Sequence, residues 1–120
     1  MITLDSQLLT KFIDTSEIES INRIFDRQGK EISPFRLTQN LNLIYEDALY
    51  ILLVFENMNL CDLYLEVYHK CSSLPIKRIP FGQGFPEIPF FCDSCQTEIC
   101  SSGDLSYNFM AIMKDSVYLI

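Results

Sequence analysis

The sequence lacks a long apolar segment and has few basic residues, and both features exclude classes of protein. Its longest uninterrupted apolar run extends from Ala48 to Phe55, well short of the roughly 18–20 residues that a membrane-spanning helix needs. Nine basic residues stand against sixteen acidic ones, for a net charge of −7. Nucleic acid phosphates and anionic lipids repel such a chain on average. We therefore expect no membrane partner, and nucleic acid is disfavoured as a partner.

The N-terminal residues also lack the features of a secretory signal. Residues 1–17 contain acidic side chains early, with neither a basic segment nor a small-residue cleavage site. This pattern predicts a cytoplasmic location. Thiols stay reduced in that compartment, so the five cysteines point to free thiols or metal ligands rather than to a disulfide framework.

The chain contains enough apolar material for one small hydrophobic core. It has 120 residues, of which 48% are hydrophobic, and a chain of this size typically forms a single domain. We expect one domain over residues 1–120, with a helical part over 1–60 and a β-rich part over 61–120.

Apolar residues recur at helical spacing through the first part of the chain. Capping residues divide this pattern, because Ser16 and the Ser33-Pro34 pair are typical helix starts and Gly29 is a typical helix end. The fourth segment is apolar on nearly all sides, which is typical of a helix covered by other elements. The expected helices cover residues 8–13, 16–29, 33–41 and about 46–58.

From Leu63 the apolar period changes to two, the spacing of a half-buried strand. Leu63, Leu65, Val67 and His69 share one face of this expected strand. Residues 76–79 are its expected partner, residues 75–91 form a proline-rich loop, and residues 105–113 and 117–120 are expected to pair as a hairpin.

Helices followed by a small antiparallel sheet predict an α+β fold. The segment ISPFRLTQNLNLIYEDALYILLVFENMNLCDLYLEVYHKC, residues 32–71, has the order helix, turn, central helix and wing strand. In this order it resembles the winged helix-turn-helix superfamily over about a third of the chain. The resemblance implies N-terminal helices in a winged-helix arrangement. A four-helix bundle with an appended hairpin is the alternative.

The clearest chemical motif is Cys92-Asp93-Ser94-Cys95. Two thiolates at this spacing can bind one zinc ion, which needs two further nitrogen or sulfur ligands in tetrahedral positions. Cys71, twenty-one positions before Cys92, is the expected third ligand, and either His69 or Cys100 is the fourth. Such zinc would be structural. The alternative is that the cysteines are small buried apolar groups and that His69 is a solvated or hydrogen-bonded residue of the strand.

No catalytic motif accompanies these cysteines. The chain has one histidine, so any nucleophile activated by an imidazole would have to lie beside His69. We therefore predict a protein without catalytic activity. Thiol-disulfide chemistry at Cys92 and Cys95 is the enzymatic alternative, although the residues that follow do not have the helical pattern that such motifs usually precede.

Two sets of apolar residues are candidates for protein contacts. Prolines lower the entropy cost of docking and aromatic rings supply contact area, which favours Phe81, Phe85 and Ile88 in the proline-rich loop. Leu8 and Phe12 on the first expected helix are suited to a homodimer contact. The alternative is that these side chains anchor the loop and close the monomer.

These features favour an accessory protein, a non-catalytic adaptor or regulatory module that binds another, larger protein and is stabilised by zinc. The alternative is a transcriptional regulator that dimerises and touches DNA near Lys77 and Arg78. DNA readers of this kind place the helix after the turn in the major groove. Here that helix, in the segment YEDALYILLVFENMN of residues 45–59, has no Lys or Arg, which disfavours the DNA-binding alternative.

Overall fold

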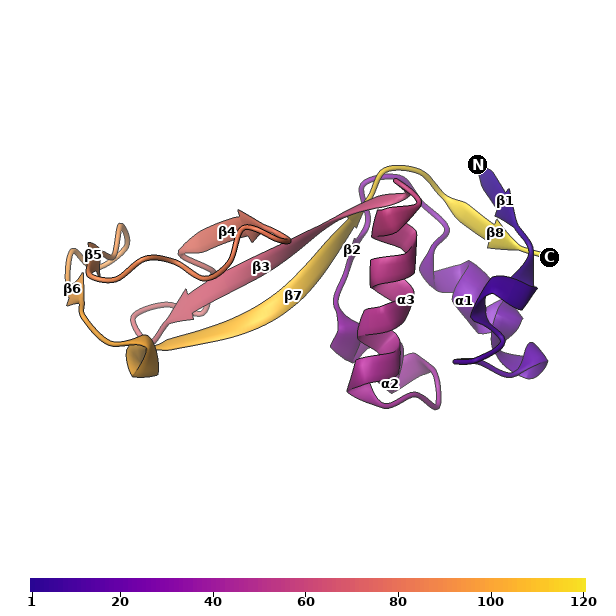
Figure 1. Ribbon diagram of the computed structural model, residues 1–120, viewed down its shortest axis with the longest axis horizontal. Coiled ribbons are helices and arrows are strands. Elements are labelled where there is room, and N and C mark those ends of the chain that lie inside the picture. The colour runs from indigo at the N-terminus through magenta and orange to yellow at the C-terminus, as the bar shows by residue number, and fades with distance from the viewer. The chain divides into compact units, whose positions relative to one another are not determined.

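The computed structural model describes residues 1–120 and confirms a mixed α+β fold (Figure 1). The helices are α1 (Ile18–Ile24), α2 (Pro34–Asn40) and α3 (Tyr45–Asn57). The strands are β1 (Ile2–Leu4), β2 (Glu31–Ile32), β3 (Cys61–His69), β4 (Lys77–Pro80), β5 (Phe90–Phe91), β6 (Glu98–Ile99), β7 (Leu105–Met113) and β8 (Val117–Leu119). None of the helices has the length and apolar content needed to cross a bilayer.

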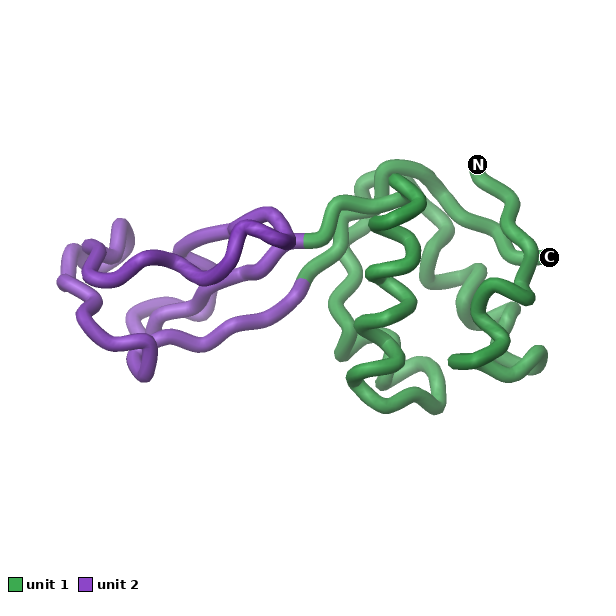
Figure 2. Tube along the Cα trace, in the orientation of Figure 1, with its two compact units in different colours: residues 1–63, 110–120 green, residues 64–109 purple.

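The chain divides into two compact units, coloured separately in Figure 2. The first unit comprises residues 1–63 and 110–120 and contains all three helices. The second comprises residues 64–109 and contains the proline-rich loop. The boundaries fall within β3 and β7, so the last residues of the chain belong to the same unit as the first.

The first unit has a well-packed apolar core. The Phe25 and Phe55 rings are buried and meet edge to face, with their centroids 4.8 Å apart. Ile21 of α1 and Leu52 of α3 are fully buried. Aromatic pairs in this geometry add to the stabilisation that burial of their surface provides.

Local hydrogen bonds explain where the helices begin. The Ser33 hydroxyl accepts a bond from the Arg36 N–H at 3.2 Å, and Pro34 occupies the first helical position, as the sequence predicts. The second start differs from the prediction, because the capping box joins Asp14 and Glu17 rather than beginning at Ser16. α1 also ends at Ile24, before Gly29, whose N–H donates to the Met113 carbonyl at 2.7 Å.

The predicted N-terminal helix over residues 8–13 is wrong. The chain forms strand β1 and then one short 3₁₀ turn, Ser6–Leu9. So short a segment does not sustain a helix by itself. Leu8 is exposed, whereas Phe12 is half-buried and stacks on Tyr50 of α3 with ring centroids 6.1 Å apart.

The predicted C-terminal hairpin is also wrong. β7 and β8 both form, but β7 lies between β2 and β3 in the four-stranded order β2-β7-β3-β4. β8 instead pairs in parallel with β1, with Ile2 opposite Val117. Its other edge is held by the Asn22 side chain, which accepts from the Leu119 N–H and donates to the Leu119 carbonyl.

In the second unit, β3 and β4 pair antiparallel, with Leu65 opposite Ile79. The pairing confirms the strand partner predicted for residues 76–79. Glu66 of β3 is buried, and its carboxylate accepts bonds from Arg78 at 2.8 Å and from the Tyr68 hydroxyl at 3.0 Å. These partners compensate for the cost of removing the charge from water.

Candidate metal centre

The first half of the cluster lies at the end of β3. Because side chains alternate along a strand, His69 points to the same face as the buried Leu65 and Val67. The chain then turns, and the Ser72 N–H donates to the His69 carbonyl at 3.2 Å. This turn places Cys71 close to the His69 ring. His69 is only 5% exposed, while Cys71 is exposed.

The second half lies in the turn between β5 and β6. The two strands pair with Phe90 opposite Ile99. The Gln96 N–H donates to the Cys92 carbonyl at 2.8 Å, and the Cys92 N–H donates to the Thr97 carbonyl at 2.9 Å. Gln96 itself has a positive φ of 62°, which sharpens the reversal. This turn lets the Cys92 and Cys95 side chains approach the same point.

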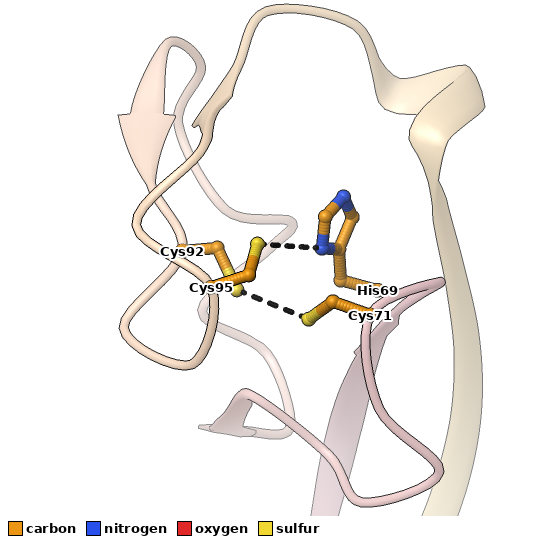
Figure 3. A group of neighbouring side chains, drawn as sticks. All are labelled: His69, Cys71, Cys92 and Cys95. Atoms are coloured by element: carbon orange, nitrogen blue, oxygen red, sulfur yellow. Dashed lines mark hydrogen bonds between the residues drawn. The ribbon is translucent and has the colours of Figure 1, made fainter.

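The two halves bring four potential metal ligands together (Figure 3). One ligand atom from each of His69, Cys71, Cys92 and Cys95 lies within 4.8 Å of all the others. The Cys71 and Cys92 Sγ atoms are 3.6 Å apart, and the Cys95 Sγ is 3.6 Å from His69 Nδ1. These four residues can hold a metal ion.

These distances agree with those between the ligands of tetrahedral zinc. Zn–S bonds of about 2.3 Å and Zn–N bonds of about 2.0–2.1 Å imply ligand separations of about 3.8 Å between two sulfurs and about 3.6 Å between sulfur and nitrogen. The Cys71–Cys92 and Cys95–His69 contacts, each 3.6 Å, come close to these two values. The donor set of three thiols and one imidazole also suits zinc chemically.

The thiols of the cluster differ in acidity. Side-chain and backbone hydrogen bonds with Thr97 lower the pKa of Cys95 to about 6. Loss of hydration and contact with the Cys92 thiol instead raise the pKa of Cys71. Near neutral pH the Cys95 thiol is therefore already ionised, whereas Cys71 must release a proton when it binds a metal.

The remaining two cysteines lie outside the cluster. Cys100 is exposed, and its Sγ lies 3.5 Å from the Glu98 carboxylate, which raises the pKa of the thiol. Cys61 belongs to the first unit, and burial raises its pKa to about 12. Between the two candidates for the fourth ligand, the structure thus brings His69 rather than Cys100 to the other three residues.

The residues expected to make protein contacts lie on the proline-rich loop. Phe81 and Phe85 line an apolar cavity of about 290 Å³ together with Leu65, Pro80 and Phe109. The Phe81 ring packs against Phe109, and the Phe85 ring against Tyr107. Phe85 nevertheless remains 68% exposed. These phenylalanines therefore anchor the loop through ring contacts, and Phe85 also presents apolar surface, while the contact with another protein stays a prediction.

Ile88 is exposed next to the cis peptide bond that joins it to Pro89. It is not among the residues that line the cavity beside Phe81 and Phe85. Of the three loop residues expected to contact a protein, Ile88 is thus the one that the cavity leaves out.

Sequence reasoning missed the roles of Thr97 and Gln96. The cysteine spacing indicates ligands but does not indicate which neighbours bond to a thiol or take a positive φ. Sequence reasoning also missed that Lys77 and Arg78, the two basic residues considered for DNA contact, interact with other residues of the chain. Arg78 pairs with the buried Glu66 carboxylate, and Lys77 Nζ lies 4.4 Å from the centre of the Phe90 ring.

Comparisons with known protein families, with curated proteins and with solved structures find no match to this chain.

Proposed function

We propose that this protein is a non-catalytic adaptor in which a structural zinc centre holds the proline-rich loop in place for binding to another protein. The observation that carries the proposal is the convergence of His69 and Cys71 with Cys92 and Cys95. The two pairs come from separate segments, and Cys71 and Cys92, whose Sγ atoms are 3.6 Å apart, are 21 positions apart in the chain. The ligand atoms are of the types that zinc prefers, and two of their separations, each 3.6 Å, come close to those of a tetrahedral site.

A structural role follows from the number of protein ligands. Zinc in structural sites is usually bound by four protein side chains, whereas catalytic zinc keeps one position for water or substrate. Three thiolates and one imidazole fill all four positions of a tetrahedral ion. Such an ion has no position left for a substrate, which supports a role in folding rather than in catalysis.

The second unit has only a small amount of buried apolar surface to stabilise it. Its buried apolar residues are few: Leu65, Val67, Cys92 and Ile99. Small units with so little buried apolar surface are typically stabilised by a metal or by disulfides. A zinc ion would link the end of β3 to the turn between β5 and β6. It would thereby fix both ends of the proline-rich loop that lies between them in the chain.

We also propose a winged-helix arrangement for this chain. The proposal is supported by the order α1, β2, α2, α3, β3 and β7 along the chain, and by the adjacency of β2, β7 and β3 within one sheet. In this assignment the residues between β3 and β7 form an enlarged wing that carries the metal centre. DNA binding remains an alternative prediction, although α3 has no basic residue and opens with Glu46 and Asp47.

Metal analysis of the full chain tests the zinc centre. We expect about one zinc per chain in protein purified without added metal, and a lower melting temperature after chelation, since metal binding is coupled to folding. Cys92→Ser should lose the metal, whereas Cys100→Ser, the matched control outside the cluster, should retain it. A metal-free wild type, or equal zinc content in both variants, would contradict the proposal.

Loop variants test the adaptor role separately. In affinity capture from cell extract, we expect wild-type protein to enrich a specific protein that Phe85→Ser no longer binds, because the exposed ring supplies contact area. Phe35→Ser removes an exposed ring from the first unit and serves as the control. Both variants should keep their zinc. Equal capture by Phe85→Ser and wild type would show that the loop does not bind the captured protein.

A further inference from the structure

The Cys71 and Cys92 sulfur atoms are in contact within the cluster. The two atoms are 3.6 Å apart, and they come from the turn after β3 and the turn after β5. The two residues differ in access to solvent, because Cys71 is exposed and Cys92 is fully buried. An exposed sulfur in contact with a buried one is the arrangement in which an oxidised thiol can be captured at once by its neighbour.

We propose that Cys71 and Cys92 are a redox modification site, at which hydrogen peroxide replaces the zinc centre with a Cys71–Cys92 disulfide. The inference rests on the zinc centre proposed above. It concerns what happens to that centre under oxidation, a property that the adaptor role does not itself require.

The chemistry takes two steps. The Cys71 thiolate attacks one peroxide oxygen, the O–O bond breaks, and a sulfenic acid and a hydroxide ion form. The Cys92 thiolate then attacks the Cys71 sulfur, so the S–S bond forms, the S–O bond breaks and a second hydroxide leaves. In sum, two thiolates lose two electrons and the peroxide gains them. Zinc loses two of its four ligands and is released.

Access and neighbours assign the two roles. The buried Cys92 is shielded from peroxide but lies in contact with Cys71, so it acts as the thiolate that resolves the sulfenic acid. Cys95 is also exposed and lies near both other thiols, but the Cys71 sulfur is the one in contact with the buried Cys92 sulfur, at 3.6 Å. The Cys95 sulfur contacts His69 Nδ1 at 3.6 Å, and the Cys100 sulfur contacts the Glu98 carboxylate at 3.5 Å. From this geometry we expect the Cys71–Cys92 bond to form and Cys95 and Cys100 to remain reduced.

The three clustered thiols allow three disulfides, of which Cys71–Cys95 would join the same two segments as Cys71–Cys92. A Cys92–Cys95 bond would stay within one turn and would leave Cys71 and His69 detached. A Cys71–Cys92 bond joins the same two segments as the zinc ion and keeps the loop between them closed. The loop is then held by metal under reducing conditions and by a disulfide under oxidising conditions.

Peptide mapping of the oxidised wild-type chain is the deciding experiment. Zinc-loaded protein is treated with one equivalent of hydrogen peroxide, released zinc is followed with a chromogenic chelator, and the remaining thiols are alkylated before digestion and mass spectrometry. We expect one zinc released per disulfide, a linked Cys71–Cys92 peptide pair, alkylated Cys95 and Cys100, and recovery of zinc binding after reduction. Cys100→Ser should behave as wild type.

Other results would overturn the inference. They are a Cys92–Cys95 or Cys71–Cys95 linkage, zinc release accompanied by sulfinic acids without a disulfide, or full retention of zinc and thiols under excess peroxide. The zinc content of the same sample is measured before oxidation. If zinc is absent at that point, the result contradicts the proposed zinc centre itself. With zinc present at the start, a wrong linkage overturns only the redox site.

Discussion

Thr97 shows how a residue outside any recognised motif sets the chemistry of a neighbour. Its hydrogen bonds lower the pKa of Cys95 to about 6, compared with the ordinary thiol value of 9.0. The charged form of Cys95 is thus favoured in the folded chain before any metal arrives. The carboxylate beside Cys100 has the opposite effect, since a negative charge disfavours a thiolate and raises its pKa.

This contrast predicts different reactivity of the two thiols. Only the thiolate reacts with alkylating agents. In reduced, metal-free protein, the iodoacetamide reaction at Cys95 should therefore reach half of its limiting rate near pH 6, as its pKa of about 6 requires. The reaction at Cys100 should begin only at distinctly higher pH. Site-resolved mass spectrometry after short reactions measures both midpoints.

Thr97→Val supplies the control for that measurement. It removes the hydroxyl but keeps the side-chain volume, so the Cys95 midpoint should move to higher pH while the Cys100 midpoint stays in place. Identical midpoints for Cys95 and Cys100 in the wild type would contradict the assigned role of Thr97.

At the scale of elements, short-range signals located most helices but only some of their caps. Ser33 and Pro34 begin α2 where the sequence predicts, because the cap bonds to a residue only three positions away. Ser16 also fits the capping pattern in the sequence, but the capping box is formed by Asp14 and Glu17 instead. Two overlapping capping patterns compete there, and the sequence does not rank them.

Replacing each serine tests this difference. Ser33→Ala should lower the free energy of unfolding by about 1 kcal/mol, the usual cost of losing an N-cap hydrogen bond. Ser16→Ala, at an exposed position, should change it by less than about 0.5 kcal/mol. Urea denaturation followed by circular dichroism measures both values. Equal effects of the two changes would argue against the capping arrangement described.

At the scale of the whole molecule, the two units are stabilised by different means. The first unit has an apolar core that includes Phe25 and Phe55. The second has few buried apolar residues and the candidate zinc centre. Loss of metal should therefore affect the units unequally, because local stability follows local burial and cross-linking.

Hydrogen exchange of the full chain detects this inequality. On chelation we expect amides in β5, in β6 and in the turn between them to lose protection, among them the Cys92 N–H that donates to the Thr97 carbonyl. Amides in α3 should retain theirs, since Ile51, Leu52 and Phe55 are buried in the first unit. Loss of protection to the same extent in α3 would mean that the metal stabilises the whole chain rather than one unit.

The sequence by itself determined the α+β class, the strand of residues 63–69 and its partner, and three of the four clustered ligands. These depend on periodicity and short spacing, which the backbone geometry of helices, strands and turns dictates directly. His69 could be placed on a strand face beside buried residues, but its selection over Cys100 could not be made.

Only the tertiary structure decided that selection, together with the pairing of β8 with β1 and the division into two units. Each depends on contacts between residues far apart in the chain, such as Ile2 with Val117 or Cys71 with Cys92. Such contacts form because many weak interactions are satisfied together, and no local pattern records which distant segments will meet. The distance between the Cys71 and Cys92 sulfurs is therefore a property of the folded chain alone.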